Sequence, residues 1–140
     1  MPTPHSPTVP VQDGVAMVAA MAPARRPGLY VFATLPDPEK AQAALPHAIA
    51  SFAEDEGQSL IVPLADAERL GLPTALPMAC LTLTVWSALD GVGLTAAVAA
   101  ALAADGIPAN IVAAFHHDHI FVPAPLADRA LAALQRIAAE

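Results

Sequence analysis

Cysteine is nearly absent from this sequence of 140 residues, which contains only Cys80. A single cysteine excludes an internal disulfide framework, and it excludes a CxxC pair for metal or redox chemistry. Because this count fits a reducing compartment, we expect a cytoplasmic protein.

Basic residues are also few. Six Lys and Arg stand against thirteen Asp and Glu, which gives a net charge of −7 at pH 7. No basic stripe offsets this charge, so nucleic-acid backbones and anionic membrane surfaces are poor partners. We therefore expect no binding to nucleic acid and none to membranes.

Long hydrophobic runs are missing as well. The most apolar stretch, Val92–Ala104, is mostly alanine and is shorter than the roughly 20 residues that cross a bilayer. The early apolar run Val15–Met21 follows Asp13 rather than lysines, so no signal peptide is expected.

Hydrophobic residues make up 56% of the chain and charged residues 14%, a composition that excludes disorder for most of the chain. The exception is Met1–Pro10, where four prolines predict a loose tail. The remaining length suffices for one compact domain, or for two very small ones that share a core.

Hydrophobic periodicity and the positions of glycine and proline predict alternating helices and strands. For example, Leu81–Trp86 alternates apolar residues with threonine, which is typical of a strand with one buried face. We expect helices over residues 13–21, 38–45, 65–70, 94–104 and 126–137, and strands over 29–35, 49–53, 58–62, 81–86, 111–115 and 120–122.

An internal repeat relates the two halves of the chain. Two strands that flank an acidic turn and end at Pro63 have a counterpart in two strands that flank the polar turn His116–His119 and end at Pro123. Each half, residues 11–77 and 78–140, reads as the βαββα opening of a ferredoxin-like unit in an α+β fold. Six strands are predicted where two complete units need eight. A strand is therefore shared, or supplied across the halves or by a second chain.

The segment Asp90–Thr95 lies between a predicted strand and a predicted helix. Gly91 and Gly93 let the backbone turn tightly and approach a ligand, and the start of the helix offers N–H groups to a carboxylate or a phosphate. The Asp90 carboxylate suits an α-amino group, and Ser87 and Thr95 offer hydroxyls, so the set favours a zwitterion over a bare anion. The alternative is a structural glycine turn with a threonine cap.

Three runs in the second half, Ser87–Val98, Gly106–Val112 and His117–Pro123, resemble the small bacterial ACT-domain proteins. In the first half, Gly28–Phe32 and Ile49–Gly57 resemble the N-terminal ACT-like half of the same proteins. The likeness covers roughly residue 11 to the end of the chain. It implies two fused ferredoxin-like ACT modules of the βαββαβ type, similar to those of aspartate kinases and cytosolic arginine sensors. Such modules bind amino acids at the interface between modules.

The resemblance also implies a ligand site. Asn110, which we place beside the end of the preceding strand and its loop, would bind a ligand through its side chain or through the backbone of residues 110–112. Alternatively, Asn110 closes the turn after Pro108. Glu54 and Glu56 would hold a cationic group if the halves face each other, or they form a solvated hairpin tip. The candidate ligand-binding residues are Ser87, Asp90, Gly91, Val92, Gly93, Leu94, Thr95, Asn110, Ile111, Val112, Glu54 and Glu56.

The histidine-rich turn raises the question of a metal site. His117 and His119 would share one face of a strand, a spacing that can ligate zinc, but no further ligands converge on them and no HExxH motif exists. We interpret His116–His119 as a polar turn or a contact near the ligand. Cys80 is predicted to be a small buried hydrophobe, and Ser87 lacks the G-x-S-x-G elbow. The sequence therefore predicts no enzyme, no metal and no cofactor.

These observations predict a regulatory sensor that binds a free amino acid, or a similar small zwitterion, at the interface between ACT modules. A homodimer is one expected state, and the output would act on a protein effector in trans. The alternative is a structural or assembly module that acts through protein–protein contacts and binds nothing small.

Overall fold

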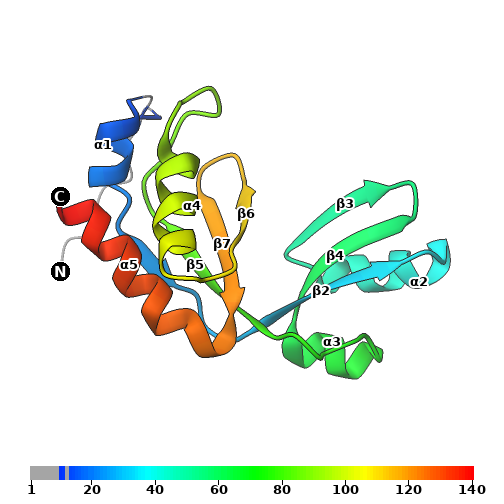
Figure 1. Cartoon of the computed structure of the whole chain (residues 1–140). Coiled ribbons are helices and arrows are strands. Elements are labelled where there is room, and N and C mark those ends of the chain that lie inside the picture. The colour runs from blue at the N-terminus through cyan, green and yellow to red at the C-terminus, as the bar shows by residue number, and fades with distance from the viewer. Residues whose placement is uncertain (1–9, 12) are drawn as a thin grey trace, which may run out of the picture. The chain divides into compact units, whose positions relative to one another are not determined.

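The computed structural model describes residues 10–11 and 13–140. The predicted tail, residues 1–10, lies outside the described residues except for Pro10. The chain divides into two compact units (Figure 1). Unit 1 combines the residues up to Arg26 with Cys80–Glu140, and unit 2 is Pro27–Ala79.

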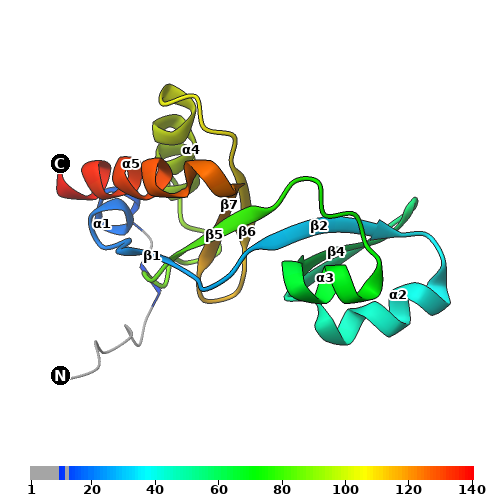
Figure 2. The same cartoon turned by 90° about the horizontal axis from the view of Figure 1, so that it is seen from below.

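Unit 2 is an antiparallel sheet with helices on one of its faces (Figures 1 and 2). Strand β4 lies between β2 and β3, and the register places Val62 opposite Val31 and Leu60 opposite Ser51. The elements follow in the order β2 (Tyr30–Leu35), α2 (Pro38–Ala44), the 3₁₀ turn η1 (Leu45–His47), β3 (Ala50–Glu54), β4 (Gly57–Pro63) and α3 (Leu64–Leu70).

The core of unit 2 follows from the two-residue period of its strands. Val31, Leu60 and Val62 are buried, and Ala44 of α2 and Ala67 of α3 complete the same cluster. Partly buried leucines of the helices and loops pack around it. The helices therefore cover one face of the sheet and leave the other face to side chains such as Phe32, which is 44% exposed.

The ends of the helices in unit 2 coincide with residues that favour them. The Asp37 side chain caps α2 by accepting a hydrogen bond from the Glu39 backbone N–H at 2.9 Å. Helix α3 ends at Gly71, whose φ of 70° is the left-handed conformation that glycine adopts at low cost. The predicted stop at Gly71 is confirmed.

Unit 1 is a sheet with the strand order β1-β5-β7-β6, in which the pairs β1/β5 and β6/β7 are antiparallel. Helices α1, α4 and α5 pack against one another (Figure 1). The elements are α1 (Gly14–Ala19), β1 (Pro23–Arg25), β5 (Met78–Leu83), α4 (Leu94–Ala104), β6 (Asn110–Ala113), β7 (Asp118–Pro123), the 3₁₀ turn η2 (Ala124–Leu126) and α5 (Ala127–Ala139).

The strand that the sequence left unassigned in the second half comes from the N-terminal segment. Strand β1 pairs with β5 in the register Pro23 opposite Leu83, and it completes the sheet of unit 1 as an edge strand. Met78, at the start of β5, belongs to unit 2 and pairs with Tyr30 of that unit. A strand supplied across the halves and a shared strand therefore both occur. Residues 13–26, assigned above to the N-terminal half, belong to unit 1.

The α+β, ferredoxin-like organisation is confirmed, but the strands of the second half have other boundaries than predicted. The strand expected over 111–115 is Asn110–Ala113. The strand expected over 81–86 is Met78–Leu83. Both faces of β5 are buried from Met78 to Leu81, so the apolar–threonine alternation marks only its end. Strand β7 begins at Asp118, so the predicted polar turn ends before His119. No helix among the described residues is long and apolar enough to cross a membrane.

Candidate functional site

The loop between β5 and α4 carries most of the predicted ligand residues, and the N-terminal segment holds it in place. The Val11 backbone N–H donates to the Trp86 carbonyl at 2.7 Å, and the Ala88 N–H donates to the Val11 carbonyl at 2.8 Å. The Gly91 N–H donates to the Ala88 carbonyl at 2.9 Å. These backbone bonds fix the path of the loop before any ligand is present.

The two glycines of this loop have a packing role. Helix α1 starts on top of the loop, and a Cβ on Gly14 would lie 2.3 Å from the Val92 carbonyl oxygen. Gly93 has a φ of 113° and would place a Cβ 3.5 Å from the Gly14 Cα. A Cβ on Gly91 would lie 3.1 Å from the Met17 Cε. The close approach of α1 therefore requires a glycine at position 14. The positive φ of Gly93, and the contacts of Gly91 with Met17 and the Ala88 carbonyl, give the loop glycines a structural reason that requires no ligand.

The start of α4 offers backbone donors. Gly93 is the N-cap, no side chain caps the helix, and its first turn holds no acidic residue. The predicted threonine cap is therefore wrong: Thr95 lies inside the first turn and is exposed. The first N–H groups of a helix have no partner within it, and the helix dipole makes this end favourable for an anion. Asp90 is exposed in the same loop.

The β6–β7 hairpin lies beside this loop. The Ser87 hydroxyl donates to Asp118 Oδ2 at 3.4 Å, and His117 Nδ1 lies 3.4 Å from the Val85 carbonyl oxygen. The sequence predicts a polar turn at His116–His119 and gives no direct sign of its contact with Ser87. The repeat alone could have indicated the contact, because it places the hairpin and the loop at the same end of one module.

Asn110 lies at the other end of the strand. It is opposite Phe121, whereas Ala113 is opposite Asp118, the residue that contacts Ser87 of the loop. At about 3.3 Å per residue, Asn110 is roughly 10 Å along β6 from the loop end. The predicted adjacency of Asn110 to the loop is therefore wrong, because β6 begins where α4 ends. Ile111 and Val112 lie between these ends, opposite Ile120 and His119.

The remaining predicted residues fall in unit 2. Glu54 ends β3 and accepts a hydrogen bond from the Ser59 hydroxyl. Glu56 is exposed in the tight turn that joins β3 to β4. Both carboxylates thus belong to the hairpin tip of unit 2. The last predicted residue, Leu94, lies in unit 1 and is buried as the first residue of α4.

Aromatic side chains gather at the same end of unit 1. The rings of Trp86, Phe115 and His116 have centroids 4.9 to 6.4 Å apart. Phe115 is 64% exposed, and the loop residues Leu89 and Val92 are 69% and 81% exposed. The loop end of unit 1 therefore presents apolar surface next to the polar groups of the loop.

Burial controls the ionisable groups of the hairpin. Asp118 is 7% exposed, and burial raises the pKa of its carboxyl, against the hydrogen bond from Ser87 and the charges of His119 and His117. Burial lowers the pKa of His119, and Arg26 and His117 add to this effect while Asp118 opposes it. His119 Nδ1 lies 2.9 Å from the Thr82 hydroxyl oxygen.

These shifts predict a pH dependence of stability. The pKa of His119 is lower in the folded protein than in the unfolded chain, where it is about 6.5. The contribution of the buried neutral side chain to stability is therefore complete above pH 6.5 and is lost as the pH falls below that value. We expect His119→Gln, which retains a partner for Thr82, to lose less stability than the wild type between pH 7.5 and 5.5. Urea unfolding followed by Trp86 fluorescence measures this loss.

The control for this experiment is His47→Gln, because His47 lies in unit 2. That variant should keep the wild-type pH dependence of the Trp86 signal. Asp118 acts in the opposite direction, since its raised pKa favours folding as it becomes protonated, and it is present in all three proteins. Equal losses of stability in His119→Gln and the wild type would contradict the assignment.

Two further predictions concern a metal site and the thiol of Cys80. No cluster of three or more His, Cys, Asp or Glu able to hold a metal occurs among residues 10–11 and 13–140. Cys80 is buried, and burial raises the pKa of its thiol despite the opposing effects of Thr82 and Arg26. A protonated buried thiol is a poor nucleophile, as the prediction of a small hydrophobe requires.

Comparisons with known proteins identify both halves. Models of the ACT domain match residues 13–79 and 76–136. A search of curated protein sequences gives no match. A structure from Vibrio cholerae, described as a protein of unknown function and possible transport protein, is 40% identical, with 86% of this chain and 92% of that chain covered and a TM-score of 0.77.

Two more distant structures share the fold. A protein from Agrobacterium tumefaciens is 20% identical over 79% of this chain and 84% of its own, with a TM-score of 0.62. The ligand-free regulatory subunit of aspartate kinase from Thermus thermophilus is 14% identical over 84% of this chain and 97% of its own, with a TM-score of 0.60. The two matching models together span most of the sequence and show that this chain belongs to the ACT-domain family, with two ACT domains in tandem.

Proposed function

We propose that this protein is a regulatory protein that binds a free amino acid at the loop between β5 and α4. ACT domains are typically regulatory modules that bind amino acids, and both halves of the chain match them. The observation that carries the proposal is the start of α4, an N-terminus without a side-chain cap directly after a loop that contains Asp90. The ligand carboxylate would accept hydrogen bonds from the first N–H groups of α4.

The neighbouring groups would recognise the rest of the ligand. The Asp90 carboxylate would pair with the α-amino group, because the two charges are opposite. The hairpin brings Asp118 to Ser87 at the same end of unit 1. Trp86 and Phe115 add apolar surface there. Asn110 is not part of this proposed site, because it lies roughly 10 Å along β6 from the loop end.

The output of such a protein acts in trans. ACT domains are regulatory rather than catalytic, so a bound amino acid has to change the affinity of the protein for a partner or for a second state. It does so only if the amino acid binds the two states with different affinities. The proposed partner is a protein effector that binds only one of the two states of this protein.

The assembly module remains the second candidate, and one observation favours it. The positive φ of Gly93 accounts for one loop glycine without any ligand, and the Ala88 carbonyl oxygen and the Met17 side chain, each 3.1 Å from a Cβ on Gly91, account for the other. In that case the loop serves only as the surface on which α1 packs, and the protein acts through contacts with other proteins.

A thermal-shift screen against the common amino acids separates the two candidates. A ligand at 100 times its Kd stabilises the folded state by about 2.7 kcal/mol, which raises the Tm by several degrees in a protein of this size. We expect one amino acid to raise the Tm of the wild type and of Asn110→Ala, and to have little effect on Asp90→Asn.

The matched control is Asp55→Asn, which removes an exposed carboxylate from the hairpin turn of unit 2. This variant should respond to the amino acid as the wild type does. If no amino acid shifts the Tm of any of these proteins, the assembly module replaces the sensor. If the amino acid raises the Tm of Asp90→Asn but not that of Asn110→Ala, the ligand site lies at the start of β6, near Asn110.

A further inference from the structure

The three helices of unit 1 form an apolar groove where they meet. Helices α1, α4 and α5 pack against one another, and the groove between them has a volume of about 320 Å³. Binding pockets in proteins have volumes of about 300 to 1,000 Å³. The residues that line the groove include Val15, Val18, Gly93, Ala97, Ile137 and Glu140. Most of this lining is aliphatic, so the groove is suited to apolar side chains.

Apolar surface continues beyond the groove. Val15 of α1 is 79% exposed, and Val92, directly before Gly93, is 81% exposed. The two segments lie against each other, because a Cβ on Gly14 would lie 2.3 Å from the Val92 carbonyl oxygen. Exposed apolar side chains that adjoin a groove are typical of an interaction site. A small ligand inside the groove would leave both valines uncovered, whereas a protein segment would cover them.

The charge around the groove is acidic. Glu140 is the charged residue of its lining. Asp13 and Asp90 are exposed, and they lie directly before the lining residue Gly14 and in the loop before Gly93. Residues 1–24 and 70–128 contain no Lys or Arg, so α1, α4 and the loop supply no basic side chain. A partner with positive charge is therefore favoured.

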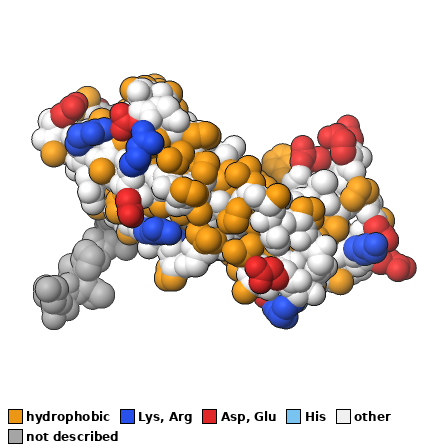
Figure 3. Space-filling view, turned by 60° about the horizontal axis from the view of Figure 1, so that its bottom comes forward, with side chains coloured by type: hydrophobic (Ala, Val, Ile, Leu, Met, Phe, Trp, Pro, Cys, Tyr) orange, Lys and Arg blue, Asp and Glu red, His pale blue; other side chains and the backbone are white. Residues whose placement is uncertain are grey.

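Three arginines of unit 1 have acidic or carbonyl partners of their own. Arg25 lies 3.7 Å from an Asp128 carboxylate oxygen, and Arg136 lies 2.8 Å from Asp105 Oδ2. Arg129 donates to the Asp105 carbonyl at 2.8 Å. In the space-filling view of Figure 3, Lys and Arg side chains stand next to acidic ones. These pairings leave the acidic side chains around the groove to a partner.

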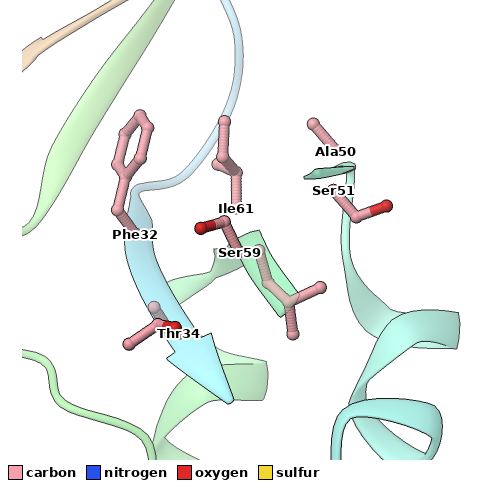
Figure 4. Close-up of a pocket in the computed structure, with 8 residues that line it drawn as sticks. Phe32, Thr34, Ala50, Ser51, Ser59 and Ile61 are labelled. Atoms are coloured by element: carbon pink, nitrogen blue, oxygen red, sulfur yellow. The ribbon is translucent and has the colours of Figure 1, made fainter. Parts of the chain in front are cut away.

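The hollow on the sheet of unit 2, shown in Figure 4, differs in this respect. Its lining includes Phe32, Thr34, Ser59 and Ile61, and none of its lining residues is charged. It therefore does not distinguish between partners of different charge. The groove of unit 1 combines an apolar lining with acidic residues, and this combination indicates the chemistry of its partner.

We propose that the groove binds a segment of a partner protein that presents apolar side chains flanked by Lys or Arg. An amphipathic helix meets this description, because it places apolar residues at i, i+3 and i+4 on one face and charged residues beside them. Its apolar side chains fill the groove and cover Val15, and its basic residues face Glu140, Asp13 and Asp90. A second copy of this chain matches less well, because it carries a net charge of −7.

The groove adjoins the proposed amino-acid site, because Gly93 lines the groove and is the N-cap of α4. A bound amino acid is therefore in a position to change the affinity of the groove for its partner. The identity of this partner as the protein effector rests on the proposed function. The groove itself is argued from its own lining and charge.

Selection from a phage-displayed library of random peptides on the wild-type protein tests the proposal. We expect the enriched peptides to share apolar residues at helical spacing with Lys or Arg beside them. Ala97→Leu, which fills the groove, should weaken the binding of an enriched synthetic peptide by roughly 10-fold or more, as measured by fluorescence anisotropy. Val15→Lys should have a similar effect, because it removes apolar contact and repels basic residues.

Ala99→Leu is the matched control, because it adds the same atoms to α4 at an exposed position outside the groove lining. This variant should bind the peptide as the wild type does, and so should Leu76→Lys, which changes an exposed apolar position of unit 2. If Ala97→Leu fails to fold, as judged by circular dichroism, Val15→Lys decides.

Four outcomes would overturn the proposal. They are the absence of any enriched peptide, enrichment of acidic peptides, equal peptide binding by Ala97→Leu and Ala99→Leu, and a wild-type dimer that Ala97→Leu dissociates, which would assign the groove to a second copy. The thermal-shift response to amino acids is measured separately on the same variants. Peptide binding without any amino-acid response would support the groove and contradict the proposed function, and an amino-acid response without peptide binding would do the reverse.

Discussion

Gly14→Ala is expected to lower the stability of unit 1 by about 2 kcal/mol and to release α1 from the loop beneath it. Alanine is the better helix former by about 1 kcal/mol, so on propensity alone this substitution at the start of α1 would stabilise the protein. The contact reverses the sign, because the new Cβ would lie 2.3 Å from the Val92 carbonyl oxygen. A backbone oxygen cannot move aside as a flexible side chain can, and overpacking costs about 1 to 3 kcal/mol.

The measurements for this variant are the Tm and the hydrogen exchange of the loop amides. Release of α1 should lower the Tm by several degrees and increase exchange at residues 88–95, while exchange in unit 2 stays unchanged. Ala16→Ser serves as the control, because it also adds one heavy atom to α1 but at an exposed position. A Gly14→Ala protein more stable than the wild type would show that α1 does not sit on the loop.

Leu60→Ala is expected to destabilise unit 2 by about 3 kcal/mol. Leu60 is 1% exposed and packs in the core with Val31, Val62 and Ala67. Truncation of a buried leucine removes its burial energy and leaves a cavity, at a cost of about 2 to 5 kcal/mol. A unit as small as residues 27–79 has little stability to lose, so most of this unit should unfold well below the wild-type Tm.

Exposed apolar residues provide the comparison for this variant. Leu45→Ala removes the same atoms from a side chain that is 38% exposed, and its effect should be well under half as large. Circular dichroism follows both units, and Trp86 fluorescence follows unit 1 alone. If Leu60→Ala and Leu45→Ala melt together, the core of unit 2 does not lie between its sheet and its helices.

The elements of the fold could be predicted largely from the sequence because local signals agree with the tertiary structure. The helix from Leu94 to Ala104 has its boundaries as predicted, since Gly93 precedes it and Gly106 with Pro108 follows it. Its buried residues Leu94, Val98 and Leu102 recur at the helical period. The internal repeat then predicted the order of the elements in both halves.

Strand β1 could not be predicted in the same way. Its three residues, Pro23–Arg25, form an exposed or half-buried edge strand that begins with a proline, so neither periodicity nor burial marks them in the sequence. Pairing with β5 defines the strand, and this partner lies more than fifty positions away along the chain. A contact of this kind depends on tertiary structure, which local patterns do not carry.

Only part of the candidate site could be predicted from the sequence, because some of its contacts also depend on tertiary structure. The loop residues from Ser87 to Thr95 are neighbours in sequence, and the structure keeps them together between β5 and α4. Asn110 was placed by analogy of topology and lies at the wrong end of β6, whereas the contact of Ser87 with Asp118 was missed. The role of Gly14 in seating α1 on the loop has no signal in the sequence beyond the glycine itself.

The most direct test of the account is to map the bound amino acid onto the backbone by ¹H–¹⁵N NMR. After the thermal-shift screen has identified an amino acid, it is titrated into labelled protein and the amide shifts are followed. We expect the largest shifts at Gly91, Gly93 and Thr95, where the loop meets the start of α4, and little change at Asn110. Shifts confined to unit 2 or to the start of β6, or no shift with any amino acid, would contradict it.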